Sequence, residues 1–480
     1  MNLMTRNDFL LKTFATGMLV GGAGRVFGSD ASQLRLGVIS DIHVTTPEST
    51  ERFVRALAYF RDRRADAVIV SGDMSDWGLR SGFKYVADAW NSVFPHDRAP
   101  DGRNVAKMFC TGNHDYDGYA YGDMTLDMHA QGYSEDDALV RYGMALCWEE
   151  SFHEPWAPIR HCRVKGYDFV IADWKGYRDF GKWMAENASE IDVGKPFFYI
   201  QHPPLKGTTL NTVDDCDDGI GKSVLSAFPN AVAFSGHYHL TLNDERSVWQ
   251  DCFTSITVPS MSYTAVPGGY ENGSHRRNGT APQSMRCIDA RFEETEAQGY
   301  FVTVEPDRMV VERRDFEACC EAASPWMLPL PARTGGVFSP MVRKMTVPIP
   351  EFPTGATLKL RFRNGSTRND RWQIAVVCEV PAAKAADGGR VFDYELRVVP
   401  SDGSAPLVKK FLSPAFHKLP KDEPLKPVFH FNAAELPQDR DYWIEIRPRN
   451  SFGIAGKPLR SKVMHGRPGL DSYTKIATKN

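Results

Sequence analysis

Five short polar clusters in the first half of the chain carry residue types that bind metal ions. They read DIH (41–43), GDMSD (72–76), GNHD (112–115), QHPP (201–204) and GHYH (236–239). Their carboxylate, carboxamide and imidazole groups are donors that suit Mn, Fe and Zn. Taken singly, each cluster could be a turn, a helix cap or a polar loop. Five in succession favour a metal site, because each directly follows a run of apolar residues.

The apolar runs predict the strands that position these clusters. The seven runs cover residues 34–40, 66–72, 105–112, 167–173, 195–201, 231–236 and 252–258. Apolar residues at helical spacing, as in 48–64, predict helices between the first of them. Short continuous apolar strands that alternate with helices indicate an α/β sheet covered on both faces. The polar clusters then lie at the carboxyl ends of strands, where active groups of such sheets belong.

The chain of 480 residues is long enough for two or three domains. Residues 324–336, SPWMLPLPARTGG, are rich in proline and glycine, and beyond them the apolar pattern has period two. We therefore expect an α/β domain at 34–320, a linker at 321–340 and a small all-β sandwich at 341–480. The sandwich could bind carbohydrate or another protein, or could brace the first domain.

Charge and composition restrict the partners and the location. The formal net charge is -3 without a long basic run, so we expect no nucleic-acid partner. No stretch after the first residues reaches the ~18 apolar residues of a membrane span. Residues 1–28 resemble a bacterial export signal, and the alternative is an amphipathic N-terminal helix. We expect the mature protein to be periplasmic or extracellular.

The order D-x-H, G-D-x-x-D, G-N-H-D, H and G-H-x-H resembles the signature of calcineurin-like metallophosphoesterases over roughly residues 34–316. This resemblance implies a two-sheet core flanked by helices, with two metal ions at the strand ends. It implies that one metal is bound by Asp41, His43 and His239, that the other is bound by Asn113, His202 and His237, and that Asp73 bridges both. It also implies that Asp76 and Asp115 orient imidazoles or His114.

The same resemblance implies hydrolysis of a small phosphoester by a hydroxide that bridges the metals, with His114 assisting the leaving group. Asp76 stands where purple acid phosphatases carry tyrosine, and the spacing looks closer to a bacterial phosphodiesterase branch. We therefore predict a dimetal phosphodiesterase that uses Mn, Fe or Zn. The alternative is a catalytically idle metal-binding or scaffold protein that kept the fold.

Overall fold

The computed structural model describes most of the chain beyond the predicted export signal. The described residues are 33–116, 143–209, 217–264, 270–271, 297–366, 372–386, 389–413, 416 and 426–466. The predicted signal at 1–28 lies outside them. No helix of these residues is long and apolar enough to cross a membrane.

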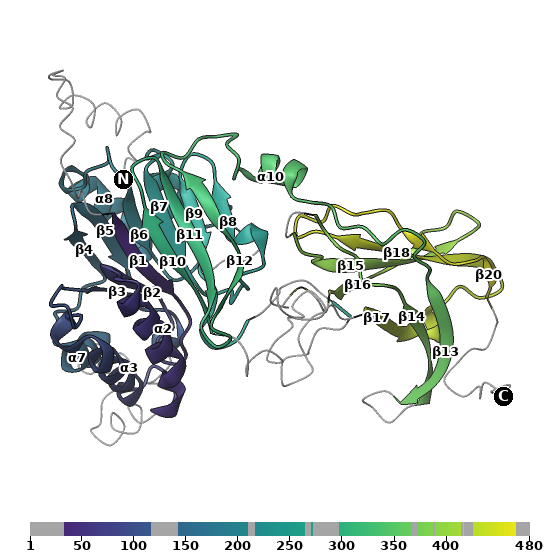
Figure 1. The fold of residues 1–480 in the computed structure, drawn as a ribbon, viewed down its shortest axis with the longest axis horizontal. Helices are drawn as coiled ribbons and strands as arrows, with labels where there is room; N and C mark the ends of the chain where they lie inside the picture. The colour runs from purple at the N-terminus through teal and green to yellow at the C-terminus, as the bar shows by residue number, and fades with distance from the viewer. Residues whose placement is uncertain are drawn as a thin grey trace.

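The first domain contains two six-stranded mixed sheets (Figure 1). The first sheet has the order β12-β11-β10-β1-β2-β3, with β1, β2 and β3 parallel. Its strands are β1 (Leu34–Ile39), β2 (Ala67–Ser71), β3 (Ala106–Cys110), β10 (Gln298–Val304), β11 (Arg308–Asp315) and β12 (Cys320–Pro329). β2 is buried along its whole length, as its uninterrupted apolar run predicts.

The second sheet has the order β4-β5-β6-β7-β9-β8, with β5, β6, β7 and β9 parallel. Its strands are β4 (Ile159–Val164), β5 (Tyr167–Ala172), β6 (Phe197–Ile200), β7 (Ala231–Ser235), β8 (Val248–Gln250) and β9 (Thr254–Thr257). All seven apolar runs of the sequence therefore contain strands.

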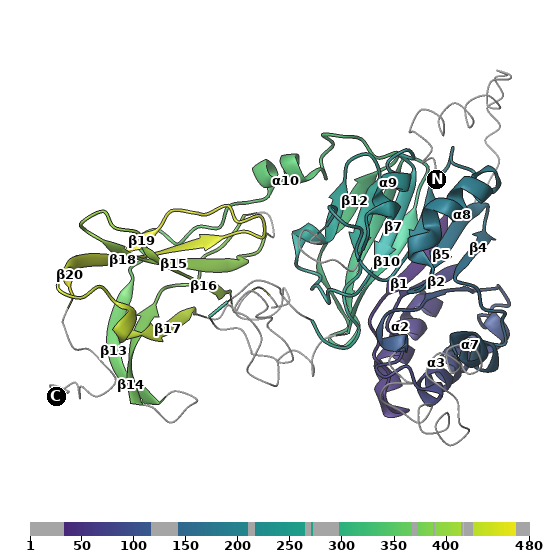
Figure 2. The same cartoon turned by 180° about the vertical axis from the view of Figure 1, so that it is seen from behind.

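The two sheets pack against each other, and helices cover their outer faces. One apolar core joins the sheets, for example through Leu36 and Ile69 of the first and Phe198 of the second. The first sheet is covered by α2 (Glu51–Asp62), α3 (Arg80–Val93) and α7 (Met144–Phe152). The second is covered by α8 (Phe180–Asn187) and α9 (Ile220–Leu225) (Figure 2). The residue pattern predicted helices on both faces of one sheet. A second sheet covers an apolar face equally well, so strand periodicity does not distinguish the two arrangements.

The C-terminal region is all-β, with two antiparallel sheets that share one apolar core. The smaller sheet contains β13 (Lys359–Ser366), β14 (Trp372–Glu379) and β17 (Val428–Asn432). The larger contains β15 (Asp393–Pro400), β16 (Leu407–Leu412), β18 (Asp441–Arg449), β19 (Leu459–Arg460) and β20 (Met464–His465). In β18, Tyr442, Ile444 and Ile446 are buried, as the period-two pattern predicts.

The predicted linker at 321–340 begins too early. β12 pairs with β11 as far as Pro329, so residues 320–329 belong to the first sheet. The connection therefore starts at Leu330 and includes the short helix α10 (Pro340–Thr346). β12 is an edge strand, and an edge tolerates Pro325 and Pro329 because it need not donate every backbone N–H.

Candidate metal centre

The structure brings the predicted metal ligands to one edge of the two sheets. Asp41 and His43 follow β1, Asp73 follows β2, Asn113 follows β3, His202 follows β6, and His237 and His239 follow β7. Six of them form two groups whose donor atoms lie within 4.8 Å of one another. The first group is Asp41, His43, Asp73 and His239; the second is Asp73, His202 and His237. Asp73 belongs to both.

Three of the four predicted imidazole ligands are oriented by an acceptor at Nδ1. The Nδ1–H groups of His43, His202 and His239 donate to the Asp76 carboxylate at 2.8 Å, the Ser71 carbonyl at 2.8 Å and the Tyr263 carbonyl at 3.0 Å. A carbonyl can only accept, so His202 and His239 carry a proton on Nδ1. The Nε2 atoms of all three rings are therefore left to face the centre, as in metal-binding histidines.

The donor atoms of this centre face each other in a way that requires a cation. His43 Nε2 lies 3.2 Å from His239 Nε2, and His202 Nε2 lies 3.3 Å from His237 Nδ1. Because His43 and His239 carry their protons on Nδ1, the lone pairs of their Nε2 atoms face each other, and the lone pair of His202 Nε2 faces the His237 ring. The Oδ1 atom of Asn113 is buried and has no hydrogen-bond partner among the described residues. A divalent metal ion satisfies all of these atoms, so the residues fit the metal centre that the sequence predicts.

The electrostatics of the buried carboxylates lead to the same conclusion. Burial alone would raise the pKa of Asp41, but His239, 3.2 Å from Asp41 Oδ1, outweighs it and lowers the pKa to about 2. Burial opposes ionisation of Asp73 as well, yet His202 at 3.1 Å holds its pKa well below the usual range. Two ionised, fully buried carboxylates need positive charge beside them.

The backbone at the centre is strained. Asp41, His43, Asp73, His237 and His239 have positive φ values of 52°, 51°, 49°, 71° and 51°. Each such residue costs of order 1–3 kcal/mol and persists only where its surroundings hold it. Here Asp41 N–H donates to the Gly72 carbonyl at 3.0 Å, and the Asp41 carboxylate accepts from His237 N–H at 3.1 Å. The loops of the two sheets thus fix each other.

The glycine of each G-D, G-N and G-H pair is required by close approach. A Cβ on Gly112 would lie 2.1 Å from Asp73 Oδ1, and one on Gly236 would lie 1.9 Å from Ser40 Oγ and 2.5 Å from Asp41 Oδ2. Any larger residue would displace a carboxylate of the centre.

Asp76, Asp115 and His114 lie next to the ligands. Besides holding His43, Asp76 accepts a 2.8 Å hydrogen bond at its backbone carbonyl from His114 Nδ1–H. Asp115 accepts from the backbone N–H groups of Met74, Ser75 and Gly112, so it joins the loops after β2 and β3. The described hydrogen bonds of its carboxylate go to backbone amides, and its predicted role of orienting an imidazole or His114 stays a prediction.

Two aromatic residues that the sequence did not single out flank the centre. The Tyr263 ring lies 4.1 Å from the His239 ring between centroids, and the Trp174 ring lies 6.0 Å from His202 and 6.1 Å from His237. Both are partly exposed. Trp174 directly follows the apolar run 167–173 and so had a positional signal, whereas Tyr263 lies in an irregular segment after β9 and had none.

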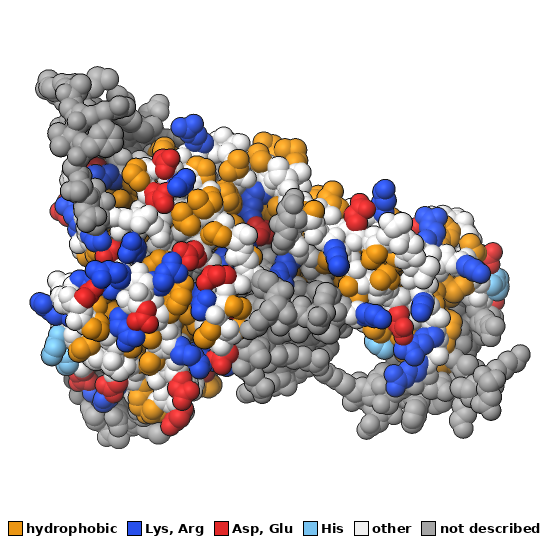
Figure 3. Space-filling view, viewed as in Figure 1, with side chains coloured by type: hydrophobic (Ala, Val, Ile, Leu, Met, Phe, Trp, Pro, Cys, Tyr) orange, Lys and Arg blue, Asp and Glu red, His pale blue; other side chains and the backbone are white. Residues whose placement is uncertain are grey.

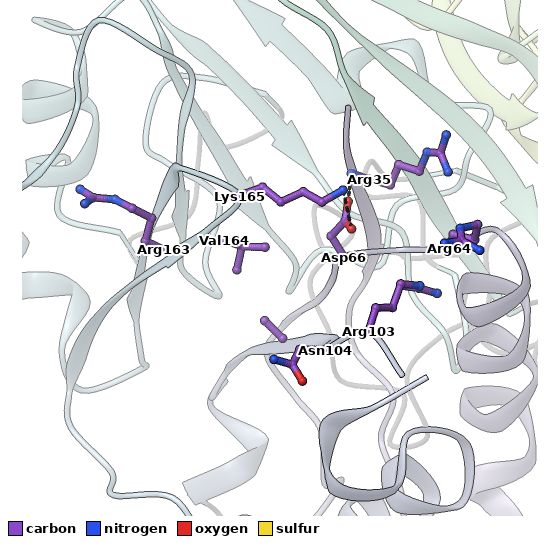
Figure 4. Close-up of a pocket in the computed structure, with 9 residues that line it drawn as sticks. Arg35, Arg64, Asp66, Arg103, Asn104, Arg163, Val164 and Lys165 are labelled. Atoms are coloured by element: carbon purple, nitrogen blue, oxygen red, sulfur yellow. Dashed lines mark hydrogen bonds and ion pairs between the residues drawn. The ribbon is translucent and has the colours of Figure 1, made fainter. Parts of the chain in front are cut away.

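A pocket of about 510 Å³ lies at the opposite ends of β1, β2 and β3 and is lined by several basic residues (Figure 4). Lys165 pairs with Asp66 at 2.8 Å, and Arg163 pairs with Asp168 at 2.8 Å. Figure 4 shows the arginines pointing apart rather than toward one point. Basic and acidic side chains are also intermixed on the face in Figure 3. This pocket lies at the end of the strands opposite the predicted metal ligands and contains none of them.

Comparison with known proteins shows which family model part of the chain matches. Residues 34–240 match the family model described as calcineurin-like phosphoesterase. No curated protein matches the sequence. Similar solved structures include a dimetal phosphatase from Danio rerio (11% identity, TM-score 0.33, 62% of this chain and 98% of that chain). They also include a purple acid phosphatase from yellow lupin, Lupinus luteus (14% identity, TM-score 0.40, 65% of this chain and 56% of that chain). The likeness to calcineurin-like phosphoesterases rests on the family model matched by residues 34–240.

Proposed function

We propose that this chain, whose residues 34–240 match the calcineurin-like phosphoesterase family model, is a metal-dependent phosphoester hydrolase that cleaves phosphodiesters with two metal ions. The observation that carries the two-metal proposal is the shared Asp73. Its carboxylate is common to both groups of donor atoms. Asp73 Oδ2 lies 3.8 Å from His43 Nε2 of the first group and 3.1 Å from His202 Nε2 of the second, so this carboxylate is within reach of both proposed metal sites.

The ligand sets follow from the two groups. Asp41, His43 and His239 would hold one metal ion, and His202 and His237 would hold the other. We add Asn113 to the second set because its buried Oδ1 atom is otherwise unsatisfied. Oxygen and imidazole donors in these proportions suit Mn, Fe or Zn.

Metal ions bound at these residues would supply an activated water and neutralise the charge of the phosphoryl group. The leaving oxygen then needs a proton or a positive charge, and we assign this role to His114. Its backbone N–H donates to Asp73 Oδ1 at 3.0 Å, and its Nδ1–H is held by Asp76. Nε2 is therefore the ring atom that can reach a substrate, and about a third of the side chain is exposed.

The surroundings of the centre favour a diester over a monoester. Tyr263 lies beside the first group of ligands and Trp174 beside the second. These partly exposed rings offer an apolar surface for each of the two ester substituents. The tyrosinate type of centre has a tyrosine ligand at the position of Asp76. Here the Asp76 carboxylate accepts a hydrogen bond from His43 instead, which separates this centre from that type.

The test is reconstitution of the purified protein with Mn, Fe or Zn, followed by metal analysis and assays on matched mono- and diesters. We expect two metals per chain and faster turnover of bis-nitrophenyl phosphate than of nitrophenyl phosphate. Asp73→Asn serves as the inactive control. A protein that holds two metals and hydrolyses no ester would support the idle-scaffold alternative instead.

We also propose that the enzyme acts outside the cytoplasm, on the basis of the export-like residues 1–28. Fractionation of the native host with N-terminal sequencing tests this proposal. An intact Met1 chain in the cytosol would contradict it without affecting the enzymatic proposal.

A further inference from the structure

The β-sandwich is docked onto the phosphoesterase domain through a small buried apolar cluster. Tyr270 comes from the segment between β9 and β10, whereas Phe392, Leu412 and Phe416 come from the sandwich. The Phe392 ring lies 4.8 Å from Phe416 and 6.1 Å from Tyr270 between centroids. All four side chains are at most 4% exposed. An interface of this kind excludes water and is more than a flexible tether.

Polar contacts join the sandwich to a second segment of the phosphoesterase domain. Asn243 Nδ2 donates to the Phe416 carbonyl at 2.8 Å. The Arg246 guanidinium lies 4.4 Å from the Phe392 ring centroid and is held in place by two hydrogen bonds to the buried Asp244. Each contact is directional, so together they fix how the sandwich sits on this segment.

The segment at residues 243–246 leads directly back to the metal centre. Asn243 is only four residues after His239, and residues 239–244 are all buried. Within this stretch Leu242 N–H donates to Gln298 Oε1 at 3.0 Å, and the Leu242 carbonyl accepts from Arg313 at 3.2 Å. Only Leu240, Thr241 and Leu242 separate Asn243 from His239, and all three are buried.

The segment at residues 270–271 follows Tyr263, which contacts the same histidine. Tyr263 accepts the Nδ1–H of His239 at its carbonyl, and seven residues later Tyr270 enters the apolar cluster. The next residue, Glu271, donates its backbone N–H to the Lys410 carbonyl of β16 at 2.8 Å. Both segments that flank His239 are thus attached to the sandwich.

We propose that the β-sandwich is a positioning domain for the metal centre, which holds His239 in its ligating orientation by fixing residues 243–246 and 270–271. The inference rests on the proposed function for its catalytic consequence, but its structural part does not. It predicts that the sandwich affects the metal bound by Asp41, His43 and His239 more than the metal bound by His202 and His237.

The test compares two phenylalanine variants of the full chain. Phe392→Ala removes a side chain at the docking cluster, whereas Phe429→Ala removes an equally buried ring in the sandwich core, where it packs on Tyr394 and Phe411. Tyr270→Ala approaches the same cluster from the phosphoesterase side. The measurements are hydrogen exchange of the Leu242 and Asp244 amides in metal-free protein and stepwise Mn²⁺ titration.

We expect Phe392→Ala and Tyr270→Ala to accelerate exchange of these amides at least tenfold and to weaken one of the two Mn²⁺ sites by a similar factor. Phe429→Ala should change both quantities less than twofold. Equal effects of all three variants, or unchanged exchange in the docking variants, would overturn the positioning role. A wild-type protein that binds no metal and hydrolyses no ester would overturn the proposed function. Accelerated exchange in Phe392→Ala and Tyr270→Ala would then still support the docking inference.

Discussion

Replacement of His114 by alanine separates leaving-group chemistry from metal binding. His114 belongs to neither of the two groups that share Asp73, and its ring meets the His43 ring edge-on at 4.7 Å between centroids. We therefore expect His114→Ala to keep both metals. The side chain is about one-third exposed, and its ring gives up one described hydrogen bond to the Asp76 carbonyl, so the free energy of unfolding should fall by only about 1 kcal/mol.

The effect on turnover should depend on the leaving group. General-acid catalysis contributes on the order of 10²–10⁴-fold, and a hundredfold loss corresponds to about 2.7 kcal/mol of transition-state stabilisation. We expect a loss of at least about a hundredfold on a dialkyl phosphodiester, because an alkoxide needs a proton to leave. The loss should be much smaller on bis-nitrophenyl phosphate, because nitrophenolate leaves without one.

The assay measures kcat on both esters together with metal content, and His237→Ala is the control that should lose metal. His43, Asp76 and His114 also form a third group of possible ligand atoms. Loss of one metal in His114→Ala would show that this third group binds metal and would refute the acid role. Equal losses on both esters with full metal content would refute it as well and leave a structural role for His114.

Three further predictions concern the metal centre. Asp73→Asn should lower turnover by about 10³-fold or more and reduce metal content, because both groups of ligands lose their shared charge; a variant that holds two metals and stays active would contradict the bridging assignment. Gly236→Ala should lower the free energy of unfolding by about 1–3 kcal/mol in urea denaturation and weaken metal binding, since its Cβ would lie 1.9 Å from Ser40 Oγ. Gly194→Ala is the control, because this exposed glycine also has no positive φ and its Cβ would lie 3.3 Å from the nearest atom, Asp192 Oδ1. Burial would lower the pKa of His202 in the metal-free protein, but the neighbouring Asp73 carboxylate outweighs burial and raises this pKa to about 9. His202 is therefore protonated near pH 7 and must lose a proton to bind metal. Calorimetry in buffers of different ionisation enthalpy should therefore show proton release near pH 7, and metal affinity should increase as the pH rises toward 9; a pH-independent affinity would contradict this.

The sequence did not predict β4, β8, β10 or β11, but it predicted seven other strands of the first domain, because each is a continuous apolar run. Each of these runs ends at the edge where the polar clusters meet. The sequence could not predict how those strands divide between two sheets. Phe198 and Leu36 are equally apolar whether a helix or a second sheet covers them. β12 was missed for a different reason, since prolines that indicate a linker in isolation are tolerated in an edge strand.

The residues that the sequence predicts as ligands could be selected because each is a chemical group of distinct type at a strand end. The groups that orient them were only partly visible. Asp76 lies within a motif, but Ser71 and Tyr263 act through backbone carbonyls, which every residue possesses. Side-chain identity therefore carries no information about these two contacts, and only the folded chain places the carbonyls.

The docking of the sandwich shows the same limit at the level of domains. Asn243 and Arg246 read as ordinary polar residues, and Tyr270 and Phe416 lie in segments without periodicity. Their roles depend on contacts between positions far apart in the sequence, such as Asn243 with Phe416, which are 173 residues apart. Because His239 receives its orientation from Tyr263 and lies four residues from Asn243, the geometry of one ligand depends on both sheets and on the sandwich. A metal centre assembled in this way couples metal affinity to the packing of the whole chain. We therefore expect substitutions far from the ligands to be detected first as changes in metal affinity.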